Sequence, residues 1–350
     1  MAVGLSGGVD SAVTALILKN EGYEVHAFYM VNWHDDANLC RNDSDHKDAM
    51  AIADQIGIPF EVLDFSNEYK ASVFSRMIDG FSNGHVPNPD IFCNQYVKFK
   101  VFFDTVRRLG FDYLATGHYA NIDNGRLIKA NDAKKDQTYF LCAIDQNTLS
   151  HLKFPLGQLT KKEVRFIAEQ NQLVVAKKKD SVGVCFVGPR SFKAFLRSYI
   201  ISKPGDIVLE NGKVVGQHDG VVFYTLGQRQ GIAVGGIKGY EDKPWYIVQK
   251  QIENNILMIS QNSKHPLLRV KRIKCHSINW IRHVPQPHTV QCVIRHNGVA
   301  YDATLEPQQN EVIWVTLNEP IYGVSIGQWC VWYDHDECLG GGEICETSAT

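Results

Sequence analysis

A glycine-rich run near the N-terminus has the residue types that hold a phosphate group. It reads Gly4-Leu5-Ser6-Gly7-Gly8-Val9-Asp10-Ser11 and lies between a predicted strand and a predicted helix. Glycines lack a Cβ, so backbone N–H groups can approach an anion at the positive end of the helix. Asp10 has the wrong charge for a direct phosphate contact, so we expect a bridging Mg²⁺. The spelling matches neither a Walker loop nor a dinucleotide-binding loop.

A second group of candidate residues surrounds Cys93. Asn88, Pro89 and Asp90 lie in a proline-restrained loop just before a helix that we predict over 97–109. Cys93 would then lie near the N-terminus of that helix, where the dipole favours a thiolate, and Asp90 could act as a base. A buried cysteine beside a capping aspartate has the same pattern, so the residues alone leave both interpretations open.

Cys185 is the second cysteine with chemical surroundings. It follows the lysine run at 177–179 and a glycine that would let a substrate approach. Nearby lysines lower the pKa of a thiol, although a solvated lysine run followed by a buried cysteine is the alternative. Two such thiols beside a phosphate loop favour sulfur transfer, in which one cysteine carries a persulfide and the other resolves the disulfide.

Strands and helices alternate in the part of the chain that must position these residues. The predicted strands cover 1–5, 25–31, 60–65 and 113–116. One predicted helix directly follows the glycine-rich run, and four more cover 45–56, 69–81, 97–109 and 161–171. This alternation predicts an α/β fold whose parallel sheet is covered by helices on both faces. We place this catalytic domain at residues 1–202.

The second half of the chain is rich in short strands and glycine turns. Asn211-Gly212 is typical of a hairpin, and we predict a small central β domain at 203–262. Strands alone follow at 290–294, 301–305, 312–317 and 328–333, which predicts a C-terminal β-barrel domain at 263–350.

Composition narrows the class of protein. The chain has 350 residues, 44% of them apolar, and a net charge of −2, so a polyanion partner would need a local basic patch. The nine cysteines include no Cys-x-x-Cys pair, which argues against a zinc ribbon or a disulfide-rich fold. No apolar run is long enough for a membrane span and few residues precede Gly4, so we expect a cytoplasmic protein without a signal peptide.

Six motifs occur in a fixed order along the chain. They are Ser6-Gly7-Gly8-Val9-Asp10-Ser11, Asn88-Pro89-Asp90-Ile91-Phe92-Cys93-Asn94, Ala115-Thr116-Gly117-His118-Tyr119, Lys135-Asp136-Gln137-Thr138-Tyr139-Phe140-Leu141, Asp180-Ser181-Val182-Gly183-Val184-Cys185-Phe186 and Tyr224-Thr225-Leu226-Gly227-Gln228-Arg229. The first resembles the PP-loop of the ATP pyrophosphatases, which cleave ATP between its α and β phosphates and pass AMP to a carbonyl oxygen. Together the six resemble the tRNA-specific 2-thiouridylases of bacteria and mitochondria, over nearly the whole chain.

That resemblance implies roles for individual residues. Residues 4–11 would bind ATP, and Met30 and Gly117 would line the adenosine pocket. Asn88, Pro89 and Asp90 would contact the flipped target uracil. Two further segments match places that contact tRNA in the family: Lys135, Asp136 and Gln137 in the catalytic domain, and Arg295 with His296 in the last domain. The family usually has an aromatic residue at the position of His296, and its first strand usually has a few more residues.

The resemblance also implies a reaction, the 2-thiolation of the wobble uridine in lysine, glutamate and glutamine tRNAs. With ATP and Mg²⁺ bound, uracil O2 would be adenylated and a persulfide on Cys185 would deliver sulfur to C2. Cys93 would attack that persulfide or C2 itself, and Asp90 is the candidate base. The target base must leave the anticodon stack first. The implied partners are tRNA and a sulfur donor, either a cysteine desulfurase or a sulfur-relay protein.

Two other classes of function compete with this interpretation. A different PP-loop enzyme, such as an amidotransferase-linked synthetase, would need neither Cys93 nor Cys185. A non-catalytic tRNA-binding protein would not need an intact glycine-rich run. Replacing Cys185 and testing for AMP and pyrophosphate formation would separate the three.

Overall fold

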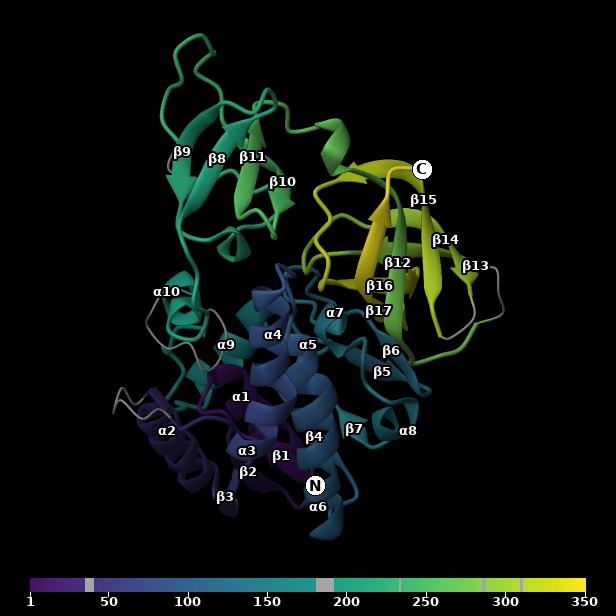
Figure 1. Ribbon diagram of the computed structural model, residues 1–350. Coiled ribbons are helices and arrows are strands. Elements are labelled where there is room, and N and C mark those ends of the chain that lie inside the picture. Colours follow the sequence, from purple (N-terminus) through teal and green to yellow (C-terminus); the bar gives the residue numbers. More distant parts are fainter. Residues whose placement is uncertain (35–40, 181–191, 233, 285–287, 309–310) are drawn as a thin grey trace.

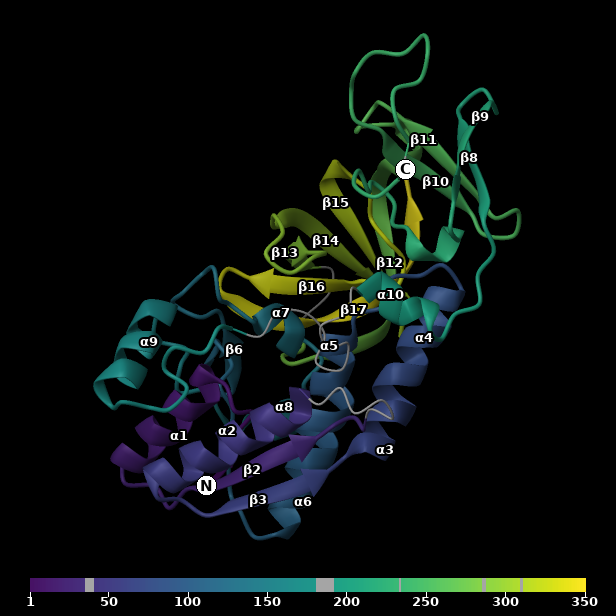
Figure 2. The ribbon, with the colours of Figure 1, turned by 90° about the vertical axis from the view of Figure 1, so that its left-hand side faces the viewer.

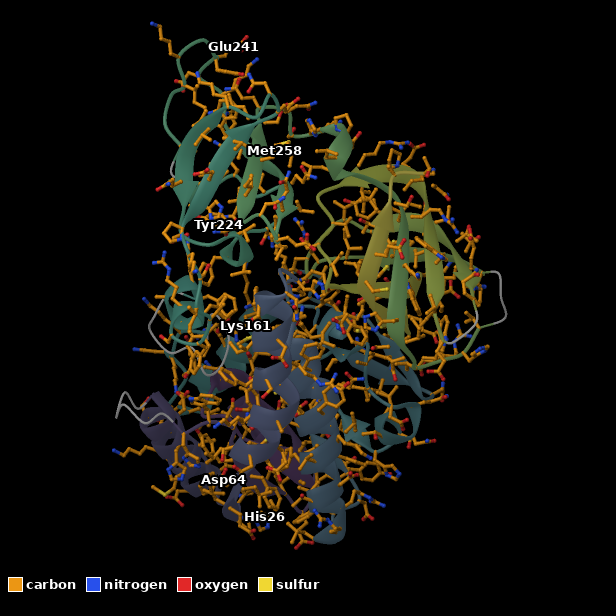
Figure 3. All side chains as sticks on the ribbon, in the orientation of Figure 1. His26, Asp64, Lys161, Tyr224, Glu241 and Met258 are labelled. Atoms are coloured by element: carbon orange, nitrogen blue, oxygen red, sulfur yellow. The ribbon has the colours of Figure 1, made fainter. Side chains whose placement is uncertain are left out.

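The computed structural model describes residues 1–34, 41–180, 192–232, 234–284, 288–308 and 311–350. The α/β part lies at the bottom of Figure 1, a small β part lies at the upper left and a barrel lies at the upper right. In Figure 3, His26 and Asp64 mark the lower end of the α/β part, while Tyr224 and Met258 lie in the small β part. None of the described helices is long and apolar enough to cross a membrane.

A parallel sheet forms the centre of the α/β part. Its strands are β1 (Ala2–Gly4), β2 (His26–Val31), β3 (Phe60–Asp64), β4 (Leu114–Ala115) and β7 (Leu152–Lys153). The order across the sheet is β3-β2-β1-β4-β7, and every pairing is parallel. The chain leaves β1 toward one side first and returns to the other side with β4. The boundary between β1 and β4 is therefore a switch point, and ligands bind such sheets there, at the carboxyl ends of the strands.

Helices cover both faces of this sheet (Figure 2). Successive strand residues point to opposite faces, and Ala2 and Val3 accordingly belong to different buried clusters. Among the described residues, the helical segments are α1 (Val9–Asn20), α2 (Arg41–Ile56), α3 (Ser66–Tyr69), η1 (Lys70–Phe74), α4 (Ser75–Ser82), α5 (Pro89–Phe92), η2 (Cys93–Phe102), α6 (Phe103–Arg108), α7 (Thr138–Leu141), α8 (Gln146–Leu149), α9 (Lys161–Gln170) and α10 (Phe192–Arg197). Helices α1, α2 and α9 cover one face, and α4, η2 and α6 cover the other.

The small β part is a four-stranded sheet, as described, with the order β10-β11-β8-β9. Its elements are β8 (Gly205–Leu209), β9 (Val214–His218), the 3₁₀ helix η3 (Val221–Phe223), β10 (Tyr246–Gln251) and β11 (Ile256–Ser260). The predicted hairpin at Asn211-Gly212 is confirmed, because β8 and β9 pair antiparallel and Gly212 has a φ of +78°.

The last part is a closed antiparallel barrel that contains six of the described strands. They are β12 (Arg269–Trp280), β13 (His288–Val293), β14 (Tyr301–Pro307), β15 (Ile313–Tyr322), β16 (Trp329–Asp334) and β17 (Glu337–Ser348), and the 3₁₀ helix η4 (Pro266–Leu268) precedes them. The pairing of β12 with β17 closes the barrel. A hairpin from the α/β part, β5 (Asn121–Asp123) with β6 (Arg126–Ile128), adds to the edge of β17.

The predicted fold class, a parallel α/β part followed by a β module and a barrel, is confirmed by this topology. The predicted start of one helix is wrong. The helical segment expected over 97–109 begins at Pro89, because Asn88 caps it by accepting a hydrogen bond from Ile91 N. The barrel strands β12 and β17 were also not predicted, and glycines 340–342 depress the strand propensity of β17.

Candidate active site

The glycine-rich run forms the turn between β1 and α1, at the carboxyl end of the central strand. Gly7 has a φ of +73°, and a Cβ added there would lie 2.2 Å from the backbone oxygen of Asp45. Gly8 is the N-cap of α1 and offers no side-chain cap, so the first N–H groups of the helix face the loop. The hydroxyls of Ser6 and Ser11 lie 3.1 Å apart beside them. This geometry fits an anion such as phosphate.

The two residues predicted to line an adenosine pocket lie at the same edge of the sheet. Gly117 follows β4 and packs against the first turn of α1, where an added Cβ would lie 2.9 Å from the backbone of Asp10 and Ser11. Met30 lies near the carboxyl end of β2 and is partly buried against a core cluster. Their position fits the expected pocket, and the adenosine contact itself stays a prediction.

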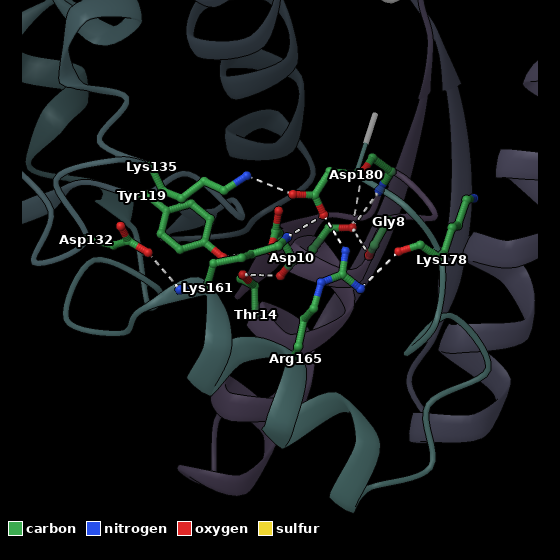
Figure 4. Close-up of polar contacts among 12 residues, drawn as sticks. Gly8, Asp10, Thr14, Tyr119, Asp132, Lys135, Lys161, Arg165, Lys178 and Asp180 are labelled. Atoms are coloured by element: carbon green, nitrogen blue, oxygen red, sulfur yellow. Dashed lines mark hydrogen bonds and ion pairs between the residues drawn. The ribbon is translucent and has the colours of Figure 1, made fainter. Parts of the chain in front are cut away.

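A network of charged side chains lies beside the loop (Figure 4). Asp10 Oδ1 accepts hydrogen bonds from Tyr119 OH at 2.8 Å and from Lys161 Nζ at 2.6 Å. Asp180 accepts from three cations: Lys135 at 2.7 Å, Lys161 at 2.9 Å and Arg165 at 2.6 Å. Burial alone would raise the pKa of Asp180, but the hydrogen bonds from the lysines hold it well below its usual range.

Lys178 ties the loop to α2. Its ammonium group donates to the backbone oxygen of Gly7 at 2.8 Å and to the carboxylates of Asp45 at 2.7 Å and Asp48 at 2.5 Å. Burial would lower the pKa of Lys178, but the two aspartates outweigh this and raise it. Lys178 therefore stays charged and fixes the carbonyl side of the loop.

Asp90 and Cys93 lie on one helical segment. Asp90 is in the first turn of α5, and Cys93 is the first residue of the π-helix η2, which continues α5. Residues three apart on a helix are neighbours on its surface, although Cys93 lies one turn further from the N-terminus than we predicted. Cys93 is buried, with 8% exposure. Burial raises the pKa of Asp90, and the charges of Lys98 and His296 oppose part of that rise.

Polar side chains on this segment contact the residues after β4. Lys98 Nζ donates to Asn94 Oδ1 at 3.1 Å and lies 3.5 Å from His118 Nε2. His118 Nδ1 lies 2.7 Å from Thr116 Oγ1. Burial lowers the pKa of His118 well below its usual value, and the charge of Lys98 adds to this. His118 is therefore neutral, and its position directly after Gly117, at the switch point, was the available signal.

Residues 135–137, which were expected to contact tRNA, form hydrogen bonds within the protein. Gln137 accepts from Tyr119 N through its side chain and donates to Tyr119 O through its backbone, both at 2.9 Å. The carboxylate of Asp136 accepts from Ala130 N at 2.8 Å and from Thr138 Oγ1 at 2.7 Å. Burial raises the pKa of Asp136 despite these bonds. Of the three predicted residues, Lys135 reaches the charged network.

The predicted pair in the barrel divides between two environments. Arg295 is exposed and donates to the backbone oxygen of Gly323, within the barrel. His296 reaches the α/β part instead: its Nε2 lies 2.9 Å from Asp136 O, and its ring is 4.4 Å from that of Phe140. The barrel thus supplies a side chain that contacts the α/β part and lowers the pKa of Asp90 by its charge.

All three parts of the chain meet at the residues before Asn88. Lys250 of the small β part donates to Gly84 O at 2.8 Å, and burial lowers the pKa of this lysine to about 8. Gln328 of the barrel donates to Val86 O at 2.7 Å, and Val86 N donates to Ile326 O at 2.8 Å. The start of α5 is therefore fixed from both β parts.

Cys185 lies outside the described residues, so its predicted role stays a prediction. Cys142 and Cys292 are core residues, since both are fully buried. Burial raises the pKa of Cys142, and the neighbouring Cys330 thiol and burial raise that of Cys292.

The described residues contain no group of three or more His, Cys, Asp or Glu side chains that could hold a metal by themselves. A Mg²⁺ would have to be held partly by phosphate oxygens, which is usual for this ion. Asp10 fits such a role, because its Oδ2 has no hydrogen-bond partner among the described residues while Oδ1 is held by Tyr119 and Lys161.

Comparisons with known proteins cover nearly the whole chain. The family described as tRNA methyl transferase HUP domain matches residues 1–189, the tRNA methyl transferase PRC-barrel domain matches 193–261, and the aminomethyltransferase beta-barrel domain matches 270–344. Among solved structures, the U34-tRNA thiolase NcsA from Methanococcus maripaludis is 22% identical and has a TM-score of 0.35, with 56% of this chain and 61% of that chain covered.

Curated relatives are much more similar. The tRNA-specific 2-thiouridylase MnmA of Halalkalibacterium halodurans is 44% identical, with 98% of this chain and 94% of the relative covered. The protein of the same name from Coxiella burnetii is 43% identical, with 98% and 97% covered. Identity at this level over nearly the full length of both chains shows common descent. The chain belongs to the tRNA-specific 2-thiouridylase family.

Proposed function

We propose that this protein uses ATP to convert the wobble uridine of lysine, glutamate and glutamine tRNAs to 2-thiouridine. Two neighbouring residues carry the proposal. Tyr119 OH contacts Asp10 in the glycine-rich loop, and His118 contacts Lys98 on the helical segment of Cys93. A phosphate site and a thiol are thus joined through one short segment at the sheet's switch point. That is the arrangement which adenylation followed by sulfur transfer requires.

The proposed reaction begins with the flipped uracil near Asn88, Pro89 and Asp90. Uracil O2 attacks the α-phosphorus of ATP, the bond to the β-phosphate oxygen breaks, and pyrophosphate leaves. Asp90 takes the proton from N3, a role that its raised pKa suits. ATP binds at residues 4–11, with Met30 and Gly117 beside the adenosine. Bound Mg²⁺ would neutralise charge on the phosphates, and Asp10 would hold it.

Sulfur transfer follows adenylation. The terminal sulfur of a Cys185 persulfide forms a bond to C2, the C2–O2 bond breaks, and AMP leaves. Cys93 then attacks Sγ of Cys185, a Cys93–Cys185 disulfide forms, and the S–S bond to the terminal sulfur breaks, so that this sulfur stays on C2. In the alternative route Cys93 attacks C2 itself and AMP leaves, and the terminal sulfur of the persulfide then displaces Cys93 from C2 before the disulfide forms. The persulfide is loaded by a cysteine desulfurase or by a sulfur-relay protein.

The tRNA would lie across all three parts. We propose a catalytic domain at 1–202, a central domain at 203–262 and a tRNA-contacting barrel domain at 263–350. Lys135, Asp136 and Gln137 and the pair Arg295 and His296 remain the proposed contacts. Because Asp136 and Gln137 are bonded internally, we expect the segment to act mainly by its backbone and by Lys135. A tRNA substrate also makes the cytoplasm the expected location.

Mass spectrometry of tRNA nucleosides tests the proposal. The full-length protein is incubated with tRNA, ATP and a competent sulfur donor, and the wobble uridine is analysed. An oxygen-to-sulfur exchange at C2 is expected. No exchange, or a methyl gain instead, contradicts the proposal.

Matched cysteine variants sharpen this experiment. Cys93→Ser and Cys185→Ser should each abolish the exchange, whereas Cys345→Ser, a partly exposed barrel residue, should not change it. Full exchange in either of the first two variants would show that the replaced thiol takes no part in sulfur transfer.

A further inference from the structure

Three cationic side chains converge on one carboxylate beside the nucleotide loop. Asp180 is contacted by Lys135, Lys161 and Arg165, and all three distances are 2.9 Å or less. Lys161 also contacts Asp10 at 2.6 Å and has a side-chain exposure of 12%. Lys161 is the first residue of α9. A capping box formed by Thr160 and Glu163 stabilises the start of this helix. The ammonium group of Lys161 is therefore held within reach of the loop.

The cations of this cluster outnumber the carboxylates that form ion pairs with them. Among the described residues, the three cations pair with two carboxylates, those of Asp10 and Asp180, while a third carboxylate, that of Asp132, accepts from the backbone N of Lys161 at 3.0 Å (Figure 4). If Asp10 binds Mg²⁺, the excess of positive charge grows further. An anion of high charge would restore neutrality, and the adjoining helix N-terminus and loop favour a phosphate.

We propose that Lys161, assisted by Arg165, binds the β- and γ-phosphates of ATP and the pyrophosphate that leaves, and that Asp180 occupies their place while the site is empty. This rests on the proposed function and adds a subsite to it. Asp180 acts as an internal anion that keeps the cations in position and is exchanged for pyrophosphate. Arg165 also donates to the backbone oxygens of Ala176 at 3.1 Å and Lys178 at 3.0 Å, so it stays oriented during the exchange.

Binding of inorganic pyrophosphate, measured by calorimetry on the full-length protein at fixed Mg²⁺, tests this exchange. Lys161→Met should weaken binding about 10-fold or more, because a charge-assisted hydrogen bond is lost. Lys162→Met is the matched control, since Lys162 is the next residue of α9 and is exposed, and its affinity should equal that of the wild type. Lys161→Arg should keep most of the affinity.

The decisive variant is Asp180→Asn, which should bind pyrophosphate more tightly than the wild type, by about 10-fold. A misfolded protein cannot show this gain. Equal affinities of Lys161→Met and Lys162→Met, or weaker binding by Asp180→Asn, would overturn the proposal. The readout needs no tRNA, so it is independent of the thiolation assay. If the wild type thiolates tRNA while Lys161→Met binds pyrophosphate as tightly as the wild type, the proposed subsite is wrong and the proposed function still holds.

Discussion

Asp90 is a carboxyl group whose surroundings pull its pKa in opposite directions. Burial raises the pKa, while Lys98 and His296 lower it, and the net shift is upward. A raised pKa makes the carboxylate a stronger base at a given pH, which suits removal of a proton from uracil. The same shift means that the ionised carboxylate costs stability in the folded state.

Replacement of Asp90 by Asn should therefore separate activity from stability. We expect the thiolation rate to fall about 100-fold or more, because general-base catalysis is lost. In the wild type, the rate should rise with pH through the elevated pKa of Asp90, and this limb should vanish in the variant. Single-turnover rates across pH measure both effects. Asp104→Asn, a partly exposed aspartate on α6, is the control.

The raised pKa of Asp90 also predicts a pH dependence of folding stability, opposite in sign to that of the thiolation rate. A folded pKa above the unfolded value means that the folded state binds more protons, so wild-type stability falls as pH rises through that window. The Asn variant lacks this fall and should be at least as stable as the wild type at neutral pH. An unchanged pH–rate profile in the variant would show that Asp90 is not the base.

Single residues also show where sequence reasoning stopped. The loop residues, Asp90 and Cys93 could be proposed as site residues because their types and spacing fit a chemistry. The contact between Lys98 and His118 could not be predicted, because it joins η2 to the segment after β4, which lies elsewhere in the chain. Gln137 differs in the opposite way. It was expected to contact tRNA, but its side chain accepts a hydrogen bond from Tyr119 N within the protein.

At the scale of elements, the β1–loop–α1 turn depends on a glycine that no other residue can replace without strain. Alanine at Gly7 would adopt a φ of +73° and would place its Cβ 2.2 Å from the backbone of α2. The left-handed conformation alone costs roughly 1–2 kcal/mol. The collision adds to this and must displace either the loop or α2. Gly7→Ala should therefore lower stability by more than the conformational cost and abolish pyrophosphate binding.

Gly110→Ala provides the matched control for that variant. Gly110 follows α6, has a φ of +94°, and has nothing within 4 Å of an added Cβ. It should show the conformational cost alone and unchanged pyrophosphate binding. Chemical denaturation and calorimetry measure both. Equal losses in the two variants would show that the contact with α2 does not matter.

The elements also show why helix starts and barrel strands differ in predictability. The start of α5 at Pro89 could have been read from Asn88 and Pro89, a capping residue followed by proline at the first helical position. The glycines of β17 could not, because they are needed for tertiary reasons. A Cβ at Gly340 would lie 2.1 Å from Asn279 O of the paired strand β12. Strand propensity is overridden there by close packing.

At the scale of the whole molecule, the barrel and the α/β part share one apolar core. Trp329, Val331 and Tyr333 of β16 belong to the same buried cluster as residues of α4, η2 and α7. Tyr139 OH donates to Trp329 O at 3.1 Å within it. The barrel is thus in a position to fix the geometry of the Asp90 segment as well as to contact tRNA.

Gly327 tests that positioning, because it packs against the chain just before Asn88. A Cβ there would lie 3.0 Å from Val86 N, 3.1 Å from His85 Cβ and 3.1 Å from Pro87 N, with a φ of +89°. Gly327→Ala should therefore shift the start of α5 and lower kcat/KM for tRNA by up to about 100-fold. Pyrophosphate binding should be unchanged, because the glycine-rich loop is held by α2 and Lys178 instead.

Gly323→Ala is the control that isolates the interdomain contact. Gly323 lies in the same β15–β16 connection with a φ of +74°, but the nearest atom to an added Cβ is 3.5 Å away, an ordinary contact. Both variants bear the same conformational cost, roughly 1–2 kcal/mol, so thermal unfolding should shift similarly. If thiolation falls only in Gly327→Ala, the barrel positions the uracil segment. If it falls equally in both, or in neither, the contact at Val86 has no role in catalysis.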